Sequence, residues 1–238
     1  MISFIVPAYN EEQCLAETLD ALNVTGLALG EAYEVLVADD GSTDQTAAIA
    51  VQKGAVLVSA THRQIAATRN SGARVATGDW LIFVDADTVV NVDVVRAAVQ
   101  SMRSGAVGGG AGICFDEPVP AYARFLLRVI VRIFRATGVA TGCFLFCTRD
   151  AFSAVGGFDE KYYGAEEIVM SRALKRQGKF VILKQTVTTS ARKLRTYSTR
   201  ETVKMMVRMA LRGTKALKQR QGMEFWYAER RADPRNDG

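Results

Sequence analysis

The chain has 238 residues, of which 49% are hydrophobic and 23% charged, and its formal net charge is +5. This balance suits one globular domain with a sizeable core, or such a domain with an appendage, and it excludes disordered and fibrous proteins. The four cysteines are spaced neither as a zinc-binding pair nor as a disulfide framework, so we expect reduced thiols and a cytoplasmic protein. No stretch approaches the ~20 apolar residues of a membrane-spanning helix.

The charge is distributed unevenly. Residues 192–238 carry 13 Lys and Arg against 5 Asp and Glu, and residues 121–138 carry four Arg and no acid. The rest of the chain is therefore acidic overall. This asymmetry predicts an acidic part that could hold a metal ion and a basic end that could meet anions.

Strands and helices alternate along the first part of the chain. Short apolar runs predict strands over 2–6, 34–38, 55–58 and 80–84. Helices are predicted directly after Asn10, which would cap the first of them, and over 43–53 and 65–76. This order with short connections is typical of an α/β fold with a doubly wound, mostly parallel sheet flanked by helices.

Beyond residue 91 the alternation becomes irregular. Helices are predicted over 93–103, 121–136 and 166–177, with a short one before Gly156, and strands over 106–115, 141–147 and 179–183. Ser198 and Glu201 form a capping box, which predicts a final long helix up to about residue 221. The chain is therefore expected to end in a helical appendage.

Paired carboxylates follow two of the predicted strands. Asp39 and Asp40 follow strand 34–38, and Asp85 and Asp87 follow strand 80–84. Each pair alone could be a turn signal or a helix cap. Parallel strands, however, end at one edge of their sheet, where such folds bind ligands. Carboxylates crowded there favour a divalent metal between them, bridging to an anionic substrate such as a nucleotide diphosphate.

Five stretches resemble the motifs of glycosyltransferase family 2. They are residues 5–11 (IVPAYNE), 37–44 (VADDGSTD), 67–73 (ATRNSGA), 78–87 (GDWLIFVDAD) and 156–160 (GGFDE). The resemblance covers about residues 1–183 in the family's order and spacing. It implies a GT-A fold: a glycosyltransferase domain over 1–190, with a nucleotide-binding half (1–90) and an acceptor half (91–190), followed by a basic helical extension over 191–238.

The resemblance also implies a donor site for a nucleotide-diphosphate sugar. Its expected residues are Pro7, Ala8, Tyr9, Asn10, Asp40, Arg63, Arg69, Asp85, Ala86, Arg192 and Lys193. Asp40 would bind the base, and Asp87, with Asp85 beside it, would hold Mg²⁺ or Mn²⁺ on the diphosphate. Arg69 could instead be an ordinary arginine on a helix surface.

A catalytic base is expected on the other side of the sugar. An acceptor hydroxyl must lose a proton as it attacks, and Glu166 and Glu167 open the helix that follows the GGFDE motif. The family usually has Glu-Asp here, with the second acid as base, so Glu167 is the preferred candidate. Glutamates are also common in the first turn of ordinary helices.

Two basic amphipathic helices are expected, over 121–136 and within the extension. They suit an anionic membrane surface and a lipid-linked acceptor, with the protein peripheral at the inner face of the membrane. The alternatives are a solvated charged face over a packed helix, or a dimer interface, so the oligomeric state stays open. Nucleic-acid binding is not expected, because no recognised module accompanies the charge.

Together these features predict an inverting, metal-assisted glycosyltransferase that moves the sugar to an acceptor hydroxyl in a single displacement. A dinucleotide-binding or nucleotidyltransferase enzyme is disfavoured, because neither GxGxxG nor a P-loop follows a strand. A nucleotide-sugar-binding or membrane-surface scaffold with impaired catalysis is the alternative, since Glu167 departs from the family pattern.

Overall fold

The computed structural model describes residues 1–116, 132, 137–192, 196, 217–218 and 220. The predicted helix over 121–136 and most of the predicted helix over 198–221 lie outside these residues, as does Lys193. The fold and the site below are those of the described residues.

A sheet of eight strands forms the centre of the described part of the chain, in the order β3-β2-β1-β4-β7-β6-β8-β5. The strands are β1 (Ile2–Ala8), β2 (Tyr33–Asp39), β3 (Val56–Ser59), β4 (Trp80–Val84), β5 (Thr88–Val89), β6 (Ala106–Phe115), β7 (Phe144–Thr148) and β8 (Lys179–Thr189). The first four run parallel. Strand β7 then enters antiparallel to both β4 and β6, while β8 runs parallel to β6 and antiparallel to β5. The α/β class is confirmed, and its second half is mixed in direction.

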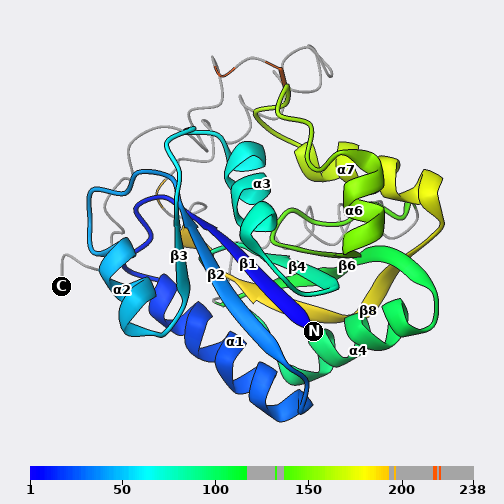
Figure 1. The fold of residues 1–238 in the computed structure, drawn as a ribbon, viewed down its shortest axis with the longest axis horizontal. Helices are drawn as coiled ribbons and strands as arrows, with labels where there is room; N and C mark the ends of the chain where they lie inside the picture. The colour runs from blue at the N-terminus through cyan, green and yellow to red at the C-terminus, as the bar shows by residue number, and fades with distance from the viewer. Residues whose placement is uncertain (117–131, 133–136, 193–195, 197–216, 219, 221–238) are drawn as a thin grey trace.

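Helices cover both faces of the sheet (Figure 1). They are α1 (Leu15–Leu29), α2 (Thr46–Gln52), α3 (Ile65–Val75), α4 (Val92–Arg103), α6 (Arg149–Val155) and α7 (Glu166–Gln177). One apolar core joins the sheet to α1 and α4, and includes Leu19 and Val95. A second core joins the opposite face to α3, α6 and α7, and includes Ala66 and Leu174. The result is a three-layer α/β/α arrangement.

Most predicted elements are confirmed, and three agree with the structure to the residue: β4, β6 and α7. The predicted start of the first helix is wrong. Asn10 adopts a left-handed backbone (φ 50°), and its Oδ1 accepts from the Thr43 amide at 2.8 Å, so it ties the loop after β2 to the loop after β1. Helix α1 begins later, at Leu15, after Cys14.

The parallel register brings the predicted motifs to one edge of the sheet. In β1, Ile2 is paired with Tyr33 of β2 and with Trp80 of β4, so the carboxyl ends of the three strands lie side by side. The segments after these ends carry Tyr9, Asp40 and the Asp85–Asp87 pair. Because ligands bind at this edge in open α/β sheets, the fold positions the candidate site there.

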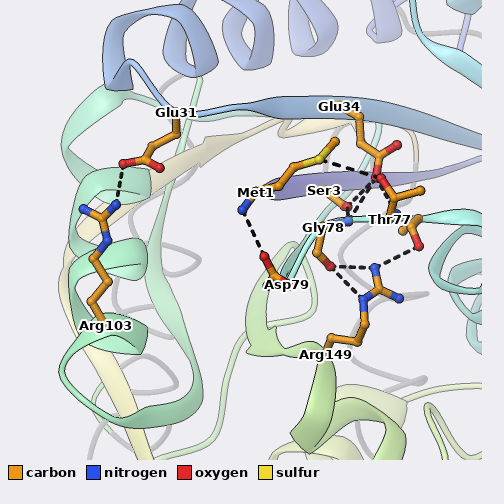
Figure 2. A network of polar contacts seen from close by, with 10 residues as sticks. Met1, Ser3, Glu31, Glu34, Thr77, Gly78, Asp79, Arg103 and Arg149 are labelled. Carbon is orange, nitrogen blue, oxygen red and sulfur yellow. Dashed lines mark hydrogen bonds and ion pairs between the residues drawn. The ribbon is translucent and has the colours of Figure 1, made fainter.

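At the opposite end of the strands, a polar network fastens the turn between α3 and β4 (Figure 2). The Glu34 Oε1 atom accepts from Ser3 Oγ and the Thr77 amide, both at 2.6 Å, and from the Gly78 amide at 3.3 Å. Arg149 donates to the Gly78 carbonyl as well. Burial alone would raise the pKa of Glu34, but the bonds from Ser3, Thr77 and Gly78 hold it below its ordinary value.

We expect Glu34→Ala to lower the free energy of unfolding by about 1–3 kcal/mol at pH 7, because it removes the acceptor of the buried Ser3 hydroxyl and of the Thr77 amide. The contribution of a carboxylate with a lowered pKa is lost as pH falls through the folded-state value, so the deficit should shrink in acid. Urea unfolding at pH 7 and at successively lower pH measures both. Glu31→Ala is the control, because Glu31 pairs with Arg103 at the surface and should cost less than about 1 kcal/mol. Equal losses in the two variants would contradict the prediction.

Candidate functional site

Arg69, on α3, lies at the centre of the candidate site. Only 1% of it is exposed, so it is not the surface arginine that the sequence left open. Its Nη2 donates to Asp85 Oδ1 at 2.7 Å and to the Gly142 carbonyl at 2.9 Å, and its Nη1 donates to Glu166 Oε1 at 2.5 Å. Burial opposes the charge of Arg69, but Asp85 and Glu166 outweigh burial and raise its pKa above the ordinary value.

Glu167 lies beside this cluster, in the first turn of α7. A Cβ atom added to Gly142 would lie 3.5 Å from the Glu167 Cδ, so the carboxyl group rests over that glycine. Burial, and then the charge of Glu166, raise the pKa of Glu167 to about 8, although Arg69 lowers it in part. Glu167 therefore combines a position at the sheet edge with the basicity that suits proton transfer near neutral pH.

Asp87 and Arg192 line a cavity of about 540 Å³ on the α1 side of the sheet. The other lining residues are Gln13, Cys14, Glu17, Thr18, Val89, Asp116, Thr188, Thr189 and Ser190. The Asp87 carbonyl accepts from the Ser190 amide at 3.0 Å, which fixes the loop after β4 against the end of β8. The cavity is thus lined by carboxylates and a buried cation.

Arg192 reaches this cavity as half of a buried ion pair. Its Nη2 donates to Glu11 Oε2, and the two residues are 7% and 5% exposed. Burial opposes the charge of Arg192, but Glu11 outweighs it and raises the pKa of Arg192. The pair joins residues far apart in sequence, at the ends of β1 and β8.

Asp116 is a cavity residue that the sequence reading missed. It follows β6, donates its amide to the Thr189 carbonyl at 3.2 Å, and accepts from the Ala191 amide at its Oδ1 at 2.9 Å. The neighbouring residues belong to none of the resembling motifs. Its position directly after the predicted strand 106–115 could have identified Asp116, because Asp40 and Asp87 were identified by the same pattern.

Asp40 is engaged in holding a loop. Its Oδ1 accepts from the amides of His62 at 2.6 Å and Arg63 at 2.9 Å, and its Oδ2 accepts from the Gln64 amide at 3.0 Å and Thr68 Oγ1 at 2.8 Å. Four bonds are about the full acceptor capacity of a carboxylate. These bonds give Asp40 a structural role in the loop that carries Arg63, and its predicted bond to the base stays a prediction.

Four of the expected donor-site residues lie at the end of β1 or just beyond it. Pro7 and Ala8 are buried in β1, while Tyr9 and Asn10 are partly exposed beyond its end. The guanidinium of Arg63 lies over the Tyr9 ring, 3.4 Å from its centre. Tyr9 and Arg63 thus stack on each other, and their contact with the donor stays a prediction.

A divalent metal fits Asp87 better than Asp85. Among the described residues, no group of three or more His, Cys, Asp and Glu is arranged to hold a metal ion. Asp85 Oδ1 is held by Arg69, whereas Asp87 is partly exposed and lines the cavity. One carboxylate completed by phosphate oxygens and water is an ordinary site for Mg²⁺, so the donor set fits an ion that arrives with a diphosphate. Ala86, between the two aspartates, is buried and accepts from Thr18 Oγ1 through its carbonyl.

The profile of Glycosyl transferase family 2 matches residues 3–156, more than half of the chain. The chain belongs to glycosyltransferase family 2. This confirms the resemblance and the class of enzyme, a glycosyltransferase.

Curated relatives of this family 2 chain include an undecaprenyl-phosphate 4-deoxy-4-formamido-L-arabinose transferase of Pseudomonas aeruginosa (strain LESB58). It is 32% identical over 157 residues, which cover 61% of this chain and 46% of the relative. The enzyme of the same description from Pseudomonas fluorescens (strain Pf0-1) is 30% identical over 157 residues, covering 60% and 45%. The family 2 chain thus spans about half the length of these relatives.

Solved structures support the GT-A fold predicted for this family 2 chain. Staphylococcus aureus TarS 1–349 in complex with UDP-GlcNAc has a TM-score of 0.64 at 20% identity, covering 89% of this chain and 66% of that one. The mannosyltransferase PcManGT from Pyrobaculum calidifontis, in complex with GDP-Man and Mn²⁺, has a TM-score of 0.69 at 20% identity, covering 95% and 66%. None of the helices in the described residues is both long and apolar enough to cross a bilayer.

Proposed function

We propose that this chain moves a sugar from a nucleotide-diphosphate donor to an acceptor hydroxyl in one displacement that inverts the anomeric centre. The observation that carries the proposal is that two different groups of side chains lie at the carboxyl edge of the sheet. Asp87 and Arg192 line a cavity that could take a diphosphate, and the basic carboxylate Glu167 lies beside Asp85 and Arg69. Different residues would then act on the two groups: Asp87 and Arg192 on the leaving diphosphate, and Glu167 on the attacking hydroxyl.

Glu167 would act as general base. Its carboxylate would accept the acceptor's proton as the hydroxyl oxygen attacks the anomeric carbon and the bond to the diphosphate breaks. A base whose pKa lies near the working pH is ionised in a substantial fraction of molecules and still has a high affinity for the proton. The raised pKa of Glu167 supports this role.

Asp87 and Arg192 would act on the leaving group. Asp87 would hold Mg²⁺ or Mn²⁺ with the diphosphate, and the ion, when bound, supplies Lewis-acid stabilisation of the departing charge. The Pyrobaculum mannosyltransferase, solved with GDP-Man and Mn²⁺, supports the same class of ion here. Arg192, and Lys193 outside the described residues, would add positive charge, while Tyr9 and Arg63 would flank the base.

The acceptor is proposed to be a hydroxyl carried on a lipid. The names of the Pseudomonas relatives refer to undecaprenyl phosphate, and the two basic segments of this chain suit an anionic surface. A phosphate oxygen is already ionised at neutral pH and would need no general base, whereas a hydroxyl would. Glu167 therefore favours a hydroxyl acceptor.

Asp87→Asn should weaken donor binding in the presence of metal. We expect UDP-, GDP- or dTDP-sugars with Mn²⁺ to raise the melting temperature of the wild type, because a ligand that binds the folded state stabilises it. The shift should largely disappear in Asp87→Asn and on addition of EDTA. Asp93→Asn, at an exposed pair with Arg96, is the control and should keep the full shift. An equal shift in Asp87→Asn would remove Asp87 from the metal site.

Glu167→Gln should lower kcat at least about 100-fold with little change in donor binding. A carboxylate takes a proton only when ionised, so wild-type kcat should rise with pH up to about 8, where Glu167 titrates, and this rise should vanish in the variant. The measurement is nucleoside diphosphate release against pH with donor and Mn²⁺, with Glu31→Gln as the remote control. Donor binding without turnover in the wild type would instead favour the scaffold alternative.

Lipid carriers of different chemistry test the acceptor. We expect transfer to a hydroxyl-bearing, lipid-linked saccharide in anionic vesicles, and a large loss of that transfer in Glu167→Gln. Radiolabelled sugar in the lipid fraction measures both. Transfer to undecaprenyl phosphate alone, unaffected by Glu167→Gln, would contradict the proposed hydroxyl acceptor while leaving the glycosyltransferase intact.

A further inference from the structure

The start of helix α7 lacks a side-chain cap. Ala165, at the N-cap position, has a left-handed backbone (φ 55°) and makes no side-chain capping bond. That region is unfavourable for a residue with a Cβ atom, so the surrounding structure must hold it. The turn held in this way carries both Glu166 and Glu167.

Arg69, on α3, fixes the first turn of α7 by bonding Glu166 in the protein interior. Its Nη1 bonds Glu166 at 2.5 Å, and with 1% and 4% of the two residues exposed, water cannot readily replace the contact. Phe158 packs against the same guanidinium, its ring centre 5.3 Å from the Arg69 Cζ. Glu166 is thus fixed by a charge-assisted bond in a dry environment, where such bonds are strong.

The same guanidinium also fixes the surface under Glu167. Arg69 Nη2 bonds the carbonyl of Gly142, the glycine on which the Glu167 carboxyl group rests. The other bond of Nη2, to Asp85, ties both to the end of β4. One planar group therefore holds the side chain of Glu166 next to Glu167, the backbone of Gly142 beneath it, and the carboxylate of Asp85 at the end of β4.

We propose that Arg69 is a positioning residue that aims the Glu167 carboxylate by tying Glu166 and Gly142 to Asp85. In this role it acts through Glu166, Gly142 and Asp85 and does not itself hold the donor, whereas the sequence placed it among the expected donor-site residues. This inference rests on the proposed role of Glu167 as base. The charged groups that act on Glu167 are Glu166 and Asp85, which raise its pKa, and Arg69, which lowers it.

The test is a carboxyl ¹³C NMR titration of the ligand-free full chain, with the Glu167 signal assigned by its loss in Glu167→Gln. In Arg69→Met the midpoint of Glu167 should rise by about one pH unit or more, because the positive charge that lowers its pKa is gone. Arg69→Lys should keep the midpoint within about half a unit, since the charge stays. Arg74→Met, on the exposed face of the same helix, should leave it unchanged.

A folded Arg69→Met with the wild-type midpoint would overturn the proposal. If Arg69→Met does not fold, Arg69→Lys decides through nucleoside diphosphate release from a panel of UDP-, GDP- and dTDP-sugars with Mn²⁺. The single ammonium nitrogen of lysine cannot reach Glu166, Asp85 and Gly142 at once, as the guanidinium does. We therefore expect kcat to fall at least about 10-fold, with the donor KM within about 2-fold. Unchanged kcat would overturn the proposal as well. The titration needs no substrate, so a wild type that transfers no sugar would count against the proposed function alone.

Discussion

A guanidinium withdrawn from water needs acceptors for its N–H groups, and the ends of three elements meet around the one on Arg69. Both of its terminal nitrogens are bonded, while its Nε has no hydrogen-bond partner among the described residues. Helix α3 carries it, β4 brings Asp85 to it, and α7 brings Glu166. Removing one partner of a buried ion pair leaves an uncompensated charge, which typically costs about 3–5 kcal/mol. The relative positions of these three elements, and hence of the whole sheet edge, are therefore constrained by one side chain.

Local patterns were enough to predict much of this fold. The apolar run of β4 and the glutamates opening α7 were identified to the residue, because each depends on its own periodicity and end signals. The carboxylates after β2 and β4 were expected at one edge, and the parallel register places them there.

The sequence could not predict which partner each side chain takes. Asp40 bonds the 62–64 loop, Asn10 bonds Thr43, and Arg192 bonds Glu11, which lies 181 residues earlier in the chain. Each choice depends on loops that only the finished fold brings together. The same holds for Asp116, whose strand β6 pairs with β8, a strand more than 60 residues later in the chain.

The position of β7 between β4 and β6 affects how the domain unfolds. It pairs with β4 on one side and β6 on the other, so the strands of residues 1–90 and those of residues 91–190 form one continuous sheet. Separating β4 from β7 would expose the hydrogen-bonding edge of β4 and leave Arg69 without Glu166, so neither part of the sheet is complete alone. We therefore expect the two parts of the sheet to unfold as one cooperative unit, so that damage at either end should reach the other as a loss of the site's geometry.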